Sequence, residues 1–202
     1  MKRILLASTI LVALAFAAFR LADVLPIGAS LPKADVKLKD ISGKDVALGN
    51  LSGKNGLLVM FSCNTCPYVI KNESRTVAIC NFARQQNMGV VLINSNEAYR
   101  DGDDSYEAMK KYAAEQKYNW HYVVDKNSII ADAFGANRTP ECFLFDKNQK
   151  LVYHGAIDDN PSDAAAVTRS HLQEAIKELV EGKEISVKES RSVGCTIKRV
   201  KG

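Results

Sequence analysis

Short apolar runs alternate along the chain with segments of helical spacing, and this pattern predicts an α/β fold. The continuous apolar run at 57–61 and the run at 90–94, apolar up to its last residue Asn94, are typical of strands buried on both faces of a sheet. Helix-compatible segments follow at 69–86 and from Tyr106 onward, and a third strand is expected at 122–125. Since sequential elements usually neighbour one another, this order predicts one central sheet with helices packed on it.

Two hairpins complete the predicted sheet. Residues 36–40 and 46–48 flank a turn-rich stretch and predict an N-terminal β-hairpin. Residues 142–146 and 151–154 predict a later antiparallel hairpin, followed by a final helix with Ser162 as its N-cap. The expected fold class is therefore α/β, with a central mixed sheet flanked by helices.

Length, composition and charge limit the number of domains and the kinds of partner that we expect. A chain of 202 residues with 47% hydrophobic and 25% charged residues fits one globular domain. A formal net charge of +4, with no basic block interleaved with aromatic residues, gives no reason to expect a nucleic-acid partner. We expect a monomer.

The N-terminus has the pattern of an export signal. Lys2 and Arg3 precede an apolar run from Ile4 to Phe19, and the small residues Ala15 and Ala17 suit cleavage. We expect a signal peptide at 1–18, with an uncleaved membrane anchor as the alternative, so the membrane is a partner only through this segment. Both versions place the folded domain outside the cytoplasm, in the periplasm or an equivalent compartment.

The candidate chemistry lies where the first buried strand meets a helix. Cys63 and Cys66 form a C-x-x-C motif directly after the run 57–61, and Pro67 suits a first helical turn. Free N–H groups at a helix N-terminus favour a thiolate, so we expect Cys63 to be partly exposed, to have a lowered pKa and to attack, with Cys66 closing a disulfide.

Metal binding is the competing interpretation of this motif. A closed zinc site needs four ligands, and the chain has no second C-x-x-C, while its three histidines lie far apart. We therefore predict redox chemistry, with no metal and no cofactor.

Three further cysteines leave an odd number in a chain predicted to be exported. Cys80 lies on the apolar side of the first helix and is expected in the core. Cys142 is either a core residue or a third thiol near the site. Cys195, in a basic tail over 183–202, is either incidental or an accessory thiol of the redox cycle, and we expect it to be more accessible than Cys80.

With these features the chain resembles thioredoxin-fold proteins over about residues 30–182. The C-x-x-C follows the central strand, and Thr139-Pro140 stands at the start of a later strand. The resemblance implies that the Thr139–Pro140 bond is cis, that it faces the motif, and that both residues bind substrate. The closest resemblance is to exported redoxin-type proteins of the alkyl-hydroperoxide-reductase-like group.

The sequence departs from the known patterns in ways that bear on activity. No acid occurs in 57–61, where thioredoxin carries a buried one. Peroxiredoxins carry Thr three residues and Pro seven residues before the reactive cysteine, whereas Met60 and Gly56 precede Cys63 at those distances. A thiol peroxidase is therefore an alternative rather than the main prediction.

A copper-binding or copper-delivery protein on the same fold is a second alternative. His154 lies roughly where copper-handling relatives carry a ligand, although those proteins use C-x-x-x-C. We predict instead an extracytoplasmic thiol-disulfide oxidoreductase that exchanges a Cys63–Cys66 dithiol or disulfide with the thiols and disulfides of partner proteins.

Overall fold

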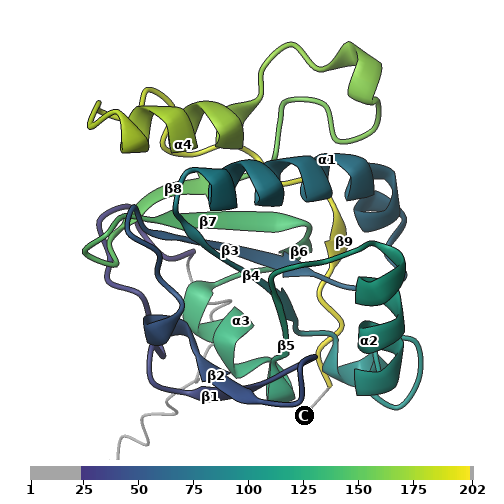
Figure 1. The fold of residues 1–202 in the computed structure, drawn as a ribbon. Helices are drawn as coiled ribbons and strands as arrows, with labels where there is room; N and C mark the ends of the chain where they lie inside the picture. The colour runs from purple at the N-terminus through teal and green to yellow at the C-terminus, as the bar shows by residue number, and fades with distance from the viewer. Residues whose placement is uncertain (1–23, 201–202) are drawn as a thin grey trace, which may run out of the picture.

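The computed structural model describes residues 24–200, and its centre is a seven-stranded mixed sheet (Figure 1). The strand order is β2-β1-β5-β4-β3-β7-β8. The strands of this sheet are β1 (Lys37–Asp40), β2 (Asp45–Ala47), β3 (Leu57–Ser62), β4 (Gly89–Asn94), β5 (His121–Val124), β7 (Glu141–Phe145) and β8 (Leu151–Gly155). The expected N-terminal hairpin is β1–β2, and the later one is β7–β8. The predicted α/β fold class is confirmed.

Helices cover both faces of the sheet. The α-helices are α1 (Pro67–Gln85), α2 (Tyr106–Glu115), α3 (Ile129–Phe134) and α4 (His171–Val180). Single 3₁₀ turns lie at η1 (Leu48–Asn50), η2 (Glu97–Tyr99), η3 (Lys126–Ser128) and η4 (Ala164–Ala166). Residues of α1, α2 and α4 share one hydrophobic cluster, and residues of α3 share the other. The sheet therefore lies between two helical layers.

Strand β3 holds the two layers together because all six of its residues are buried. Side chains of a strand alternate between faces. Leu58 and Met60 thus enter the cluster under α1, while Val59 and Phe61 enter the cluster with α3. β3 pairs in parallel with β4 and antiparallel with β7, so its carboxyl end is fixed from both sides.

The last helix begins later than the sequence predicted. Ser162 is not its N-cap: the chain first forms η4, which is capped by the side chain of Asp163, and α4 starts after Ser170. The polar residues of this loop bond to one another, for example Asp163 N to Asn160 Oδ1 at 2.9 Å. These local bonds satisfy the backbone without a helix.

After α4 the chain crosses back to the carboxyl end of β3. There β9 (Cys195–Thr196) pairs antiparallel with β6 (Arg138–Thr139) as a separate two-stranded ribbon. Figure 1 shows this yellow segment running beside β6. The predicted signal peptide at 1–18 lies outside the described residues. Within 24–200, no helix has the length and apolar character needed to span a membrane.

Aromatic packing beneath β3 gives a prediction about stability. Phe143 is fully buried, with its ring centroid 5.6 Å from Phe61 and 5.1 Å from Phe134. Phe143→Ala should lower the free energy of unfolding by about 3–5 kcal/mol, because it removes apolar contacts and leaves a cavity. Urea unfolding of oxidised protein measures this change. Tyr99→Ala, at an exposed side chain, should change it by no more than about 0.5 kcal/mol. A similar decrease in the free energy of unfolding in both variants would contradict the placement of Phe143 at the centre of the core.

Candidate redox site

The C-x-x-C motif lies between the end of β3 and the start of α1. Cys66 is the N-cap residue of α1 with extended backbone angles, and Pro67 occupies the first helical turn as predicted. Pro is tolerated there because the first N–H groups of a helix have no intrahelical partner. Cys63 lies in the short loop between β3 and α1. Both sulfurs are therefore near the N-terminus of α1.

Thr139 and Pro140 lie directly against the motif. The Thr139–Pro140 peptide bond is cis, as the sequence resemblance implied. Cys63 Sγ is 3.5 Å from Thr139 Oγ1, and Cys66 Sγ is 3.4 Å from the Thr139 carbonyl oxygen. The structure thus brings together four of the predicted site residues.

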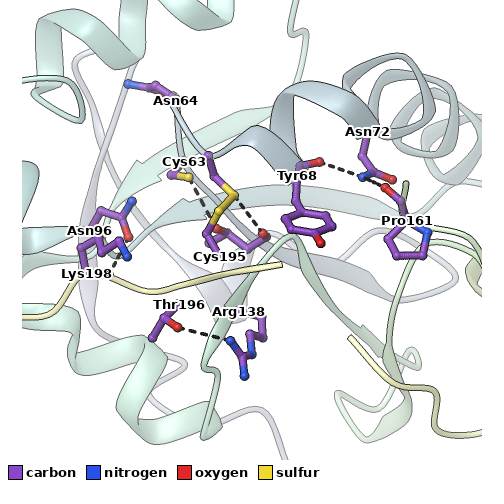
Figure 2. Close-up of a disulfide and its surroundings, with 12 residues drawn as sticks. Cys63, Asn64, Tyr68, Asn72, Asn96, Arg138, Pro161, Cys195, Thr196 and Lys198 are labelled. Carbon is purple, nitrogen blue, oxygen red and sulfur yellow. Dashed lines mark hydrogen bonds between the residues drawn. A yellow bond between two sulfur atoms is a disulfide. The ribbon is translucent and has the colours of Figure 1, made fainter. Parts of the chain in front are cut away.

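Cys195 is also part of the site, and its bonding differs from the expected pairing. The disulfide joins Cys66 to Cys195, with Cα atoms 6.1 Å apart, while Cys63 is a free thiol (Figure 2). A Cys63–Cys66 disulfide is therefore not the one formed in this state. The two bonded residues are separated by 129 positions, so their proximity depends on the path of the tail.

The tail is held on the site by main-chain contacts around Cys195. Cys195 lies opposite Thr139 in the β6–β9 pair, and Ile197 N donates to the Asn137 carbonyl at 3.1 Å. Gly194 passes so close to the Thr139 carbonyl that a Cβ at this position would collide with it. Only glycine fits at this crossing.

The burial and the pKa of Cys63 differ from what the sequence predicted. Its side chain is only 1% exposed, and this burial raises the pKa of the Cys63 thiol above its ordinary value. The Thr139 hydroxyl and the backbone N–H groups of Cys66 and Thr65 lower the same pKa, and the nearby Asp104 raises it. The prediction that Cys63 is partly exposed and has a lowered pKa is therefore wrong for the state in which the tail is docked.

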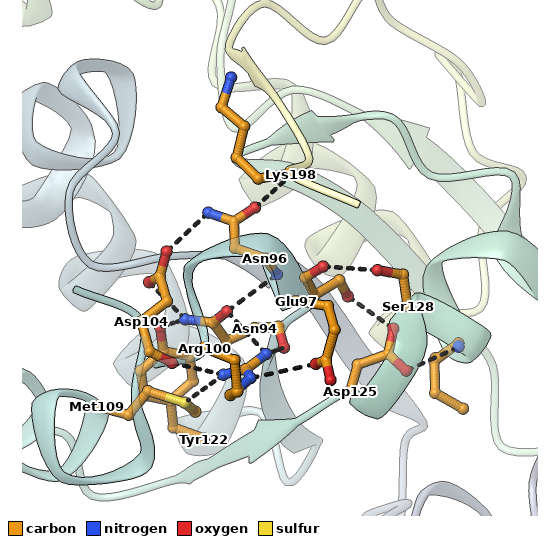
Figure 3. Close-up of polar contacts among 12 residues, drawn as sticks. Asn94, Asn96, Glu97, Arg100, Asp104, Met109, Tyr122, Asp125, Ser128 and Lys198 are labelled. Carbon is orange, nitrogen blue, oxygen red and sulfur yellow. Dashed lines mark hydrogen bonds and ion pairs between the residues drawn. The ribbon is translucent and has the colours of Figure 1, made fainter. Parts of the chain in front are cut away.

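A buried polar network, which the sequence did not reveal, holds the loop between the two motif cysteines. Asp104 is fully buried and accepts from Asn64 N at 2.9 Å and from the side chains of Asn94 and Asn96. Tyr122 donates its hydroxyl to Asn64 Oδ1 at 2.9 Å. Figure 3 shows Asp104 and the two asparagines in contact. Asn64 follows β3 and Asn96 follows β4, which is the adjacent parallel strand. This placement was the available signal, since the carboxyl ends of neighbouring parallel strands share one edge of the sheet.

The same network reaches the tail. Asn96 donates to Asp104 Oδ2 at 2.9 Å and accepts from Lys198 N at 2.8 Å, a link also visible in Figure 3. Asn64 and Lys198 are thus linked through Asp104 and Asn96. The docking of the tail is physically connected to the loop that carries Cys63.

Glu141 is a second residue that sequence analysis missed. Its carboxylate accepts from the N–H groups of Asn137 and Arg138 at 2.8 and 2.9 Å, and so fixes the turn before Thr139. Glu141 Oε1 also lies 2.8 Å from His154 Nε2. His154 is thus hydrogen-bonded to a buried carboxylate. No group of three metal-ligating side chains occurs within residues 24–200.

The remaining cysteines lie in the core. Cys80 and Cys142 are both fully buried in the cluster between the sheet and α1. Burial raises the pKa of both thiols strongly. Cys142 is therefore a core residue rather than a third thiol of the site. Cys195 is more exposed than Cys80, as predicted.

A C-x-x-C at a helix N-terminus, facing a cis-proline beside a mixed sheet, defines the thioredoxin-fold class. A match to the AhpC/TSA family covers residues 27–154, and the chain belongs to this family. The resemblance inferred from the sequence is confirmed.

Several solved structures are similar to this chain. An uncharacterized conserved protein from Geobacillus kaustophilus has 33% identity and a TM-score of 0.81, covering 88% of this chain and 94% of its own. A hypothetical protein from Sinorhizobium meliloti 1021 has 30% identity and a TM-score of 0.81, covering 89% and 98%. A putative thiol:disulfide interchange protein DsbE from Chlorobium tepidum has 18% identity and a TM-score of 0.57, covering 78% and 97%, and shares the fold. The comparison with curated proteins finds no significant match.

The contact between Cys63 and Thr139 gives a prediction about pH dependence. The Thr139 hydroxyl lowers the pKa of Cys63, so Thr139→Val should raise it further. The thiolate fraction at a given alkaline pH then falls, and Cys63 alkylation should shift to higher pH. Mass spectrometry of oxidised protein, alkylated over a pH series, measures the shift.

Thr196→Val is the matched control for this measurement. Thr196 lies in the same ribbon, but its hydroxyl accepts from Arg138 rather than contacting a sulfur. The alkylation profile of this variant should match that of the unmodified protein. An unchanged or lower midpoint in Thr139→Val would show that the hydroxyl does not stabilise the thiolate.

Proposed function

We propose that this protein is a thiol-disulfide oxidoreductase that exchanges disulfides with partner proteins through Cys63 and Cys66. One observation carries the proposal: a cysteine in an extended main-chain segment lies antiparallel to Thr139 and is disulfide-bonded to the motif. A site that accepts its own tail in this way suits an extended segment of another protein, because strand addition uses main-chain hydrogen bonds available to any sequence. Thr139 and Pro140 would form the substrate-binding edge.

Cys63 is the proposed nucleophile. The N–H groups of Thr65 and Cys66 lower the pKa of its thiol, and burial is the largest opposing influence. Cys195 of the docked tail packs against the cluster that contains Cys63 and so contributes to this burial. The Cys63 thiolate attacks a partner disulfide, forms a mixed disulfide and releases one partner thiolate. Cys66 then attacks Cys63, so that the partner leaves reduced and Cys63–Cys66 is oxidised; the reverse sequence oxidises a partner dithiol.

A peroxidase or a copper carrier is supported less well. The chain lacks the Thr and the Pro that peroxiredoxins carry three and seven residues before the reactive cysteine, because positions 60 and 56 are Met and Gly. His154, the imidazole expected for a copper site, belongs to no group of three metal-ligating side chains within residues 24–200. Exchange with protein thiols needs neither feature.

We also propose an extracytoplasmic location. The basic and apolar pattern of residues 1–18 supports it, and so does a disulfide between distant cysteines, since such bonds persist in oxidising compartments.

Replacing the motif cysteines tests the proposed activity. Cys63→Ser and Cys66→Ser should each reduce catalysed reduction of a protein disulfide, such as that of insulin, to the uncatalysed rate. Each variant lacks one of the two sulfurs that close the cycle. Cys66→Ser should in addition accumulate a mixed disulfide between Cys63 and the substrate, detectable by mass spectrometry.

Cys80→Ala is the control, because Cys80 is a core residue away from the site. It should retain turnover. Equal turnover in Cys63→Ser and the unmodified protein, or a mixed disulfide trapped on another cysteine, would refute the proposed role of Cys63.

A further inference from the structure

The tail occupies the place where a partner segment would bind. Cys195 pairs with Thr139, and Thr196 pairs with Arg138, so β9 uses the main-chain groups at this edge of the site. Cys63, Cys66 and Cys195 pack together in one small cluster with Val69 and Tyr68. An external partner that binds as proposed would therefore compete with the tail for this edge.

Docking of the tail is specific on both sides of Cys195. On the carboxyl side, Ile197 is only 3% exposed, and the main chain of Lys198 bonds to Ala98 N at 2.9 Å and to Asn96 Oδ1 at 2.8 Å. On the amino side, Ser190 Oγ accepts from Ala156 N at 2.9 Å and lies 2.7 Å from Tyr153 Oη. Anchors at both ends mark this as a built position for Cys195 rather than an incidental approach.

Cys63 is placed to react with the disulfide of the tail. It is a free thiol beside Thr139, the residue whose carbonyl oxygen also contacts Cys66 Sγ. Thiol-disulfide exchange requires only that a thiolate reach a disulfide sulfur. The three cysteines thus contain one disulfide and one thiol that can exchange without any other reactant.

We propose that Cys195 is a third redox cysteine, and that the disulfide moves between Cys66–Cys195 and Cys63–Cys66. The Cys63 thiolate attacks Cys66 Sγ, the Cys63–Cys66 bond forms as the Cys66–Cys195 bond breaks, and Cys195 leaves as a thiolate. The proton lost by Cys63 is gained by Cys195. Two sulfurs stay oxidised throughout, so no external oxidant or reductant is consumed.

This movement couples the redox site to access by partners. When the Cys66–Cys195 disulfide is formed, the tail is covalently bonded to the site and Cys63 is buried. With Cys63–Cys66 formed, only non-covalent contacts hold the tail, and a partner strand can replace it. This coupling rests on the proposed function, in which Cys63–Cys66 is the disulfide that reacts with partner thiols.

Gly194 offers a test that changes no cysteine. A Cβ there would collide with the Thr139 carbonyl when the tail is docked, yet the Gly194 backbone lies outside the left-handed region, so alanine fits the undocked tail. Gly102→Ala is the matched control, because its nearest neighbour, Tyr99 O, would lie 3.9 Å from the new Cβ. Any difference between the two variants then reports on docking of the tail.

The experiment maps disulfides in the oxidised full chain after acid quenching and alkylation of free thiols, by mass spectrometry. The unmodified protein should contain both Cys66–Cys195 and Cys63–Cys66, and should redistribute faster as pH rises, because Cys63 must ionise. Cys63→Ser should contain only Cys66–Cys195. Gly194→Ala should lose Cys66–Cys195 by at least about tenfold in favour of Cys63–Cys66, whereas Gly102→Ala should match the unmodified protein.

Three results would overturn the inference. These are Cys195 free in every oxidised form of the unmodified protein, a Cys66–Cys195 bond that never redistributes at alkaline pH, or the same disulfide map in Gly194→Ala and Gly102→Ala. Turnover of a protein disulfide by the same unmodified preparation is measured in parallel. Absence of turnover would refute the proposed function, while the disulfide map alone decides the role of Cys195.

Discussion

The pairing of β3 with β4 on one side and β7 on the other is the constraint on which the site depends. This pairing places β3 at the centre of the sheet, where the clusters on both faces bury its side chains, and it fixes the point where the chain leaves the sheet toward Cys63. Because β7 runs antiparallel to β3, the segment that precedes it, with Thr139 and Pro140, returns to the same edge. The packing of a buried strand thus determines which residues can face the cysteines.

Thr139 then brings the three sulfurs of the site together. Its hydroxyl contacts Cys63, its carbonyl contacts Cys66, and its main chain pairs with Cys195. Glu141 holds the turn before it through two N–H groups, and Asp104 holds the loop that follows Cys63. Both carboxylates are buried and satisfied by hydrogen bonds, which makes their arrangement costly to disturb.

Opposing effects on Cys63 explain why its chemistry depends on the tail. A helix N-terminus and its N–H groups favour the thiolate, as they do in any C-x-x-C motif of this kind. Removal of water by the surrounding residues outweighs them here and raises the pKa. The balance between reactive and protected forms of the same thiol is therefore set by what covers it.

The sequence by itself determined the parts of this protein that follow from local pattern. Apolar runs predicted β3 and β4, the C-x-x-C and Pro67 predicted a helix start, and Thr139-Pro140 predicted the cis bond through resemblance. Only the tertiary structure decided that Cys66 bonds to Cys195, that Cys63 is buried, and that Asp104 and Glu141 support the site. These features arise from contacts between segments far apart in the chain, which side-chain periodicity and motif spacing do not encode.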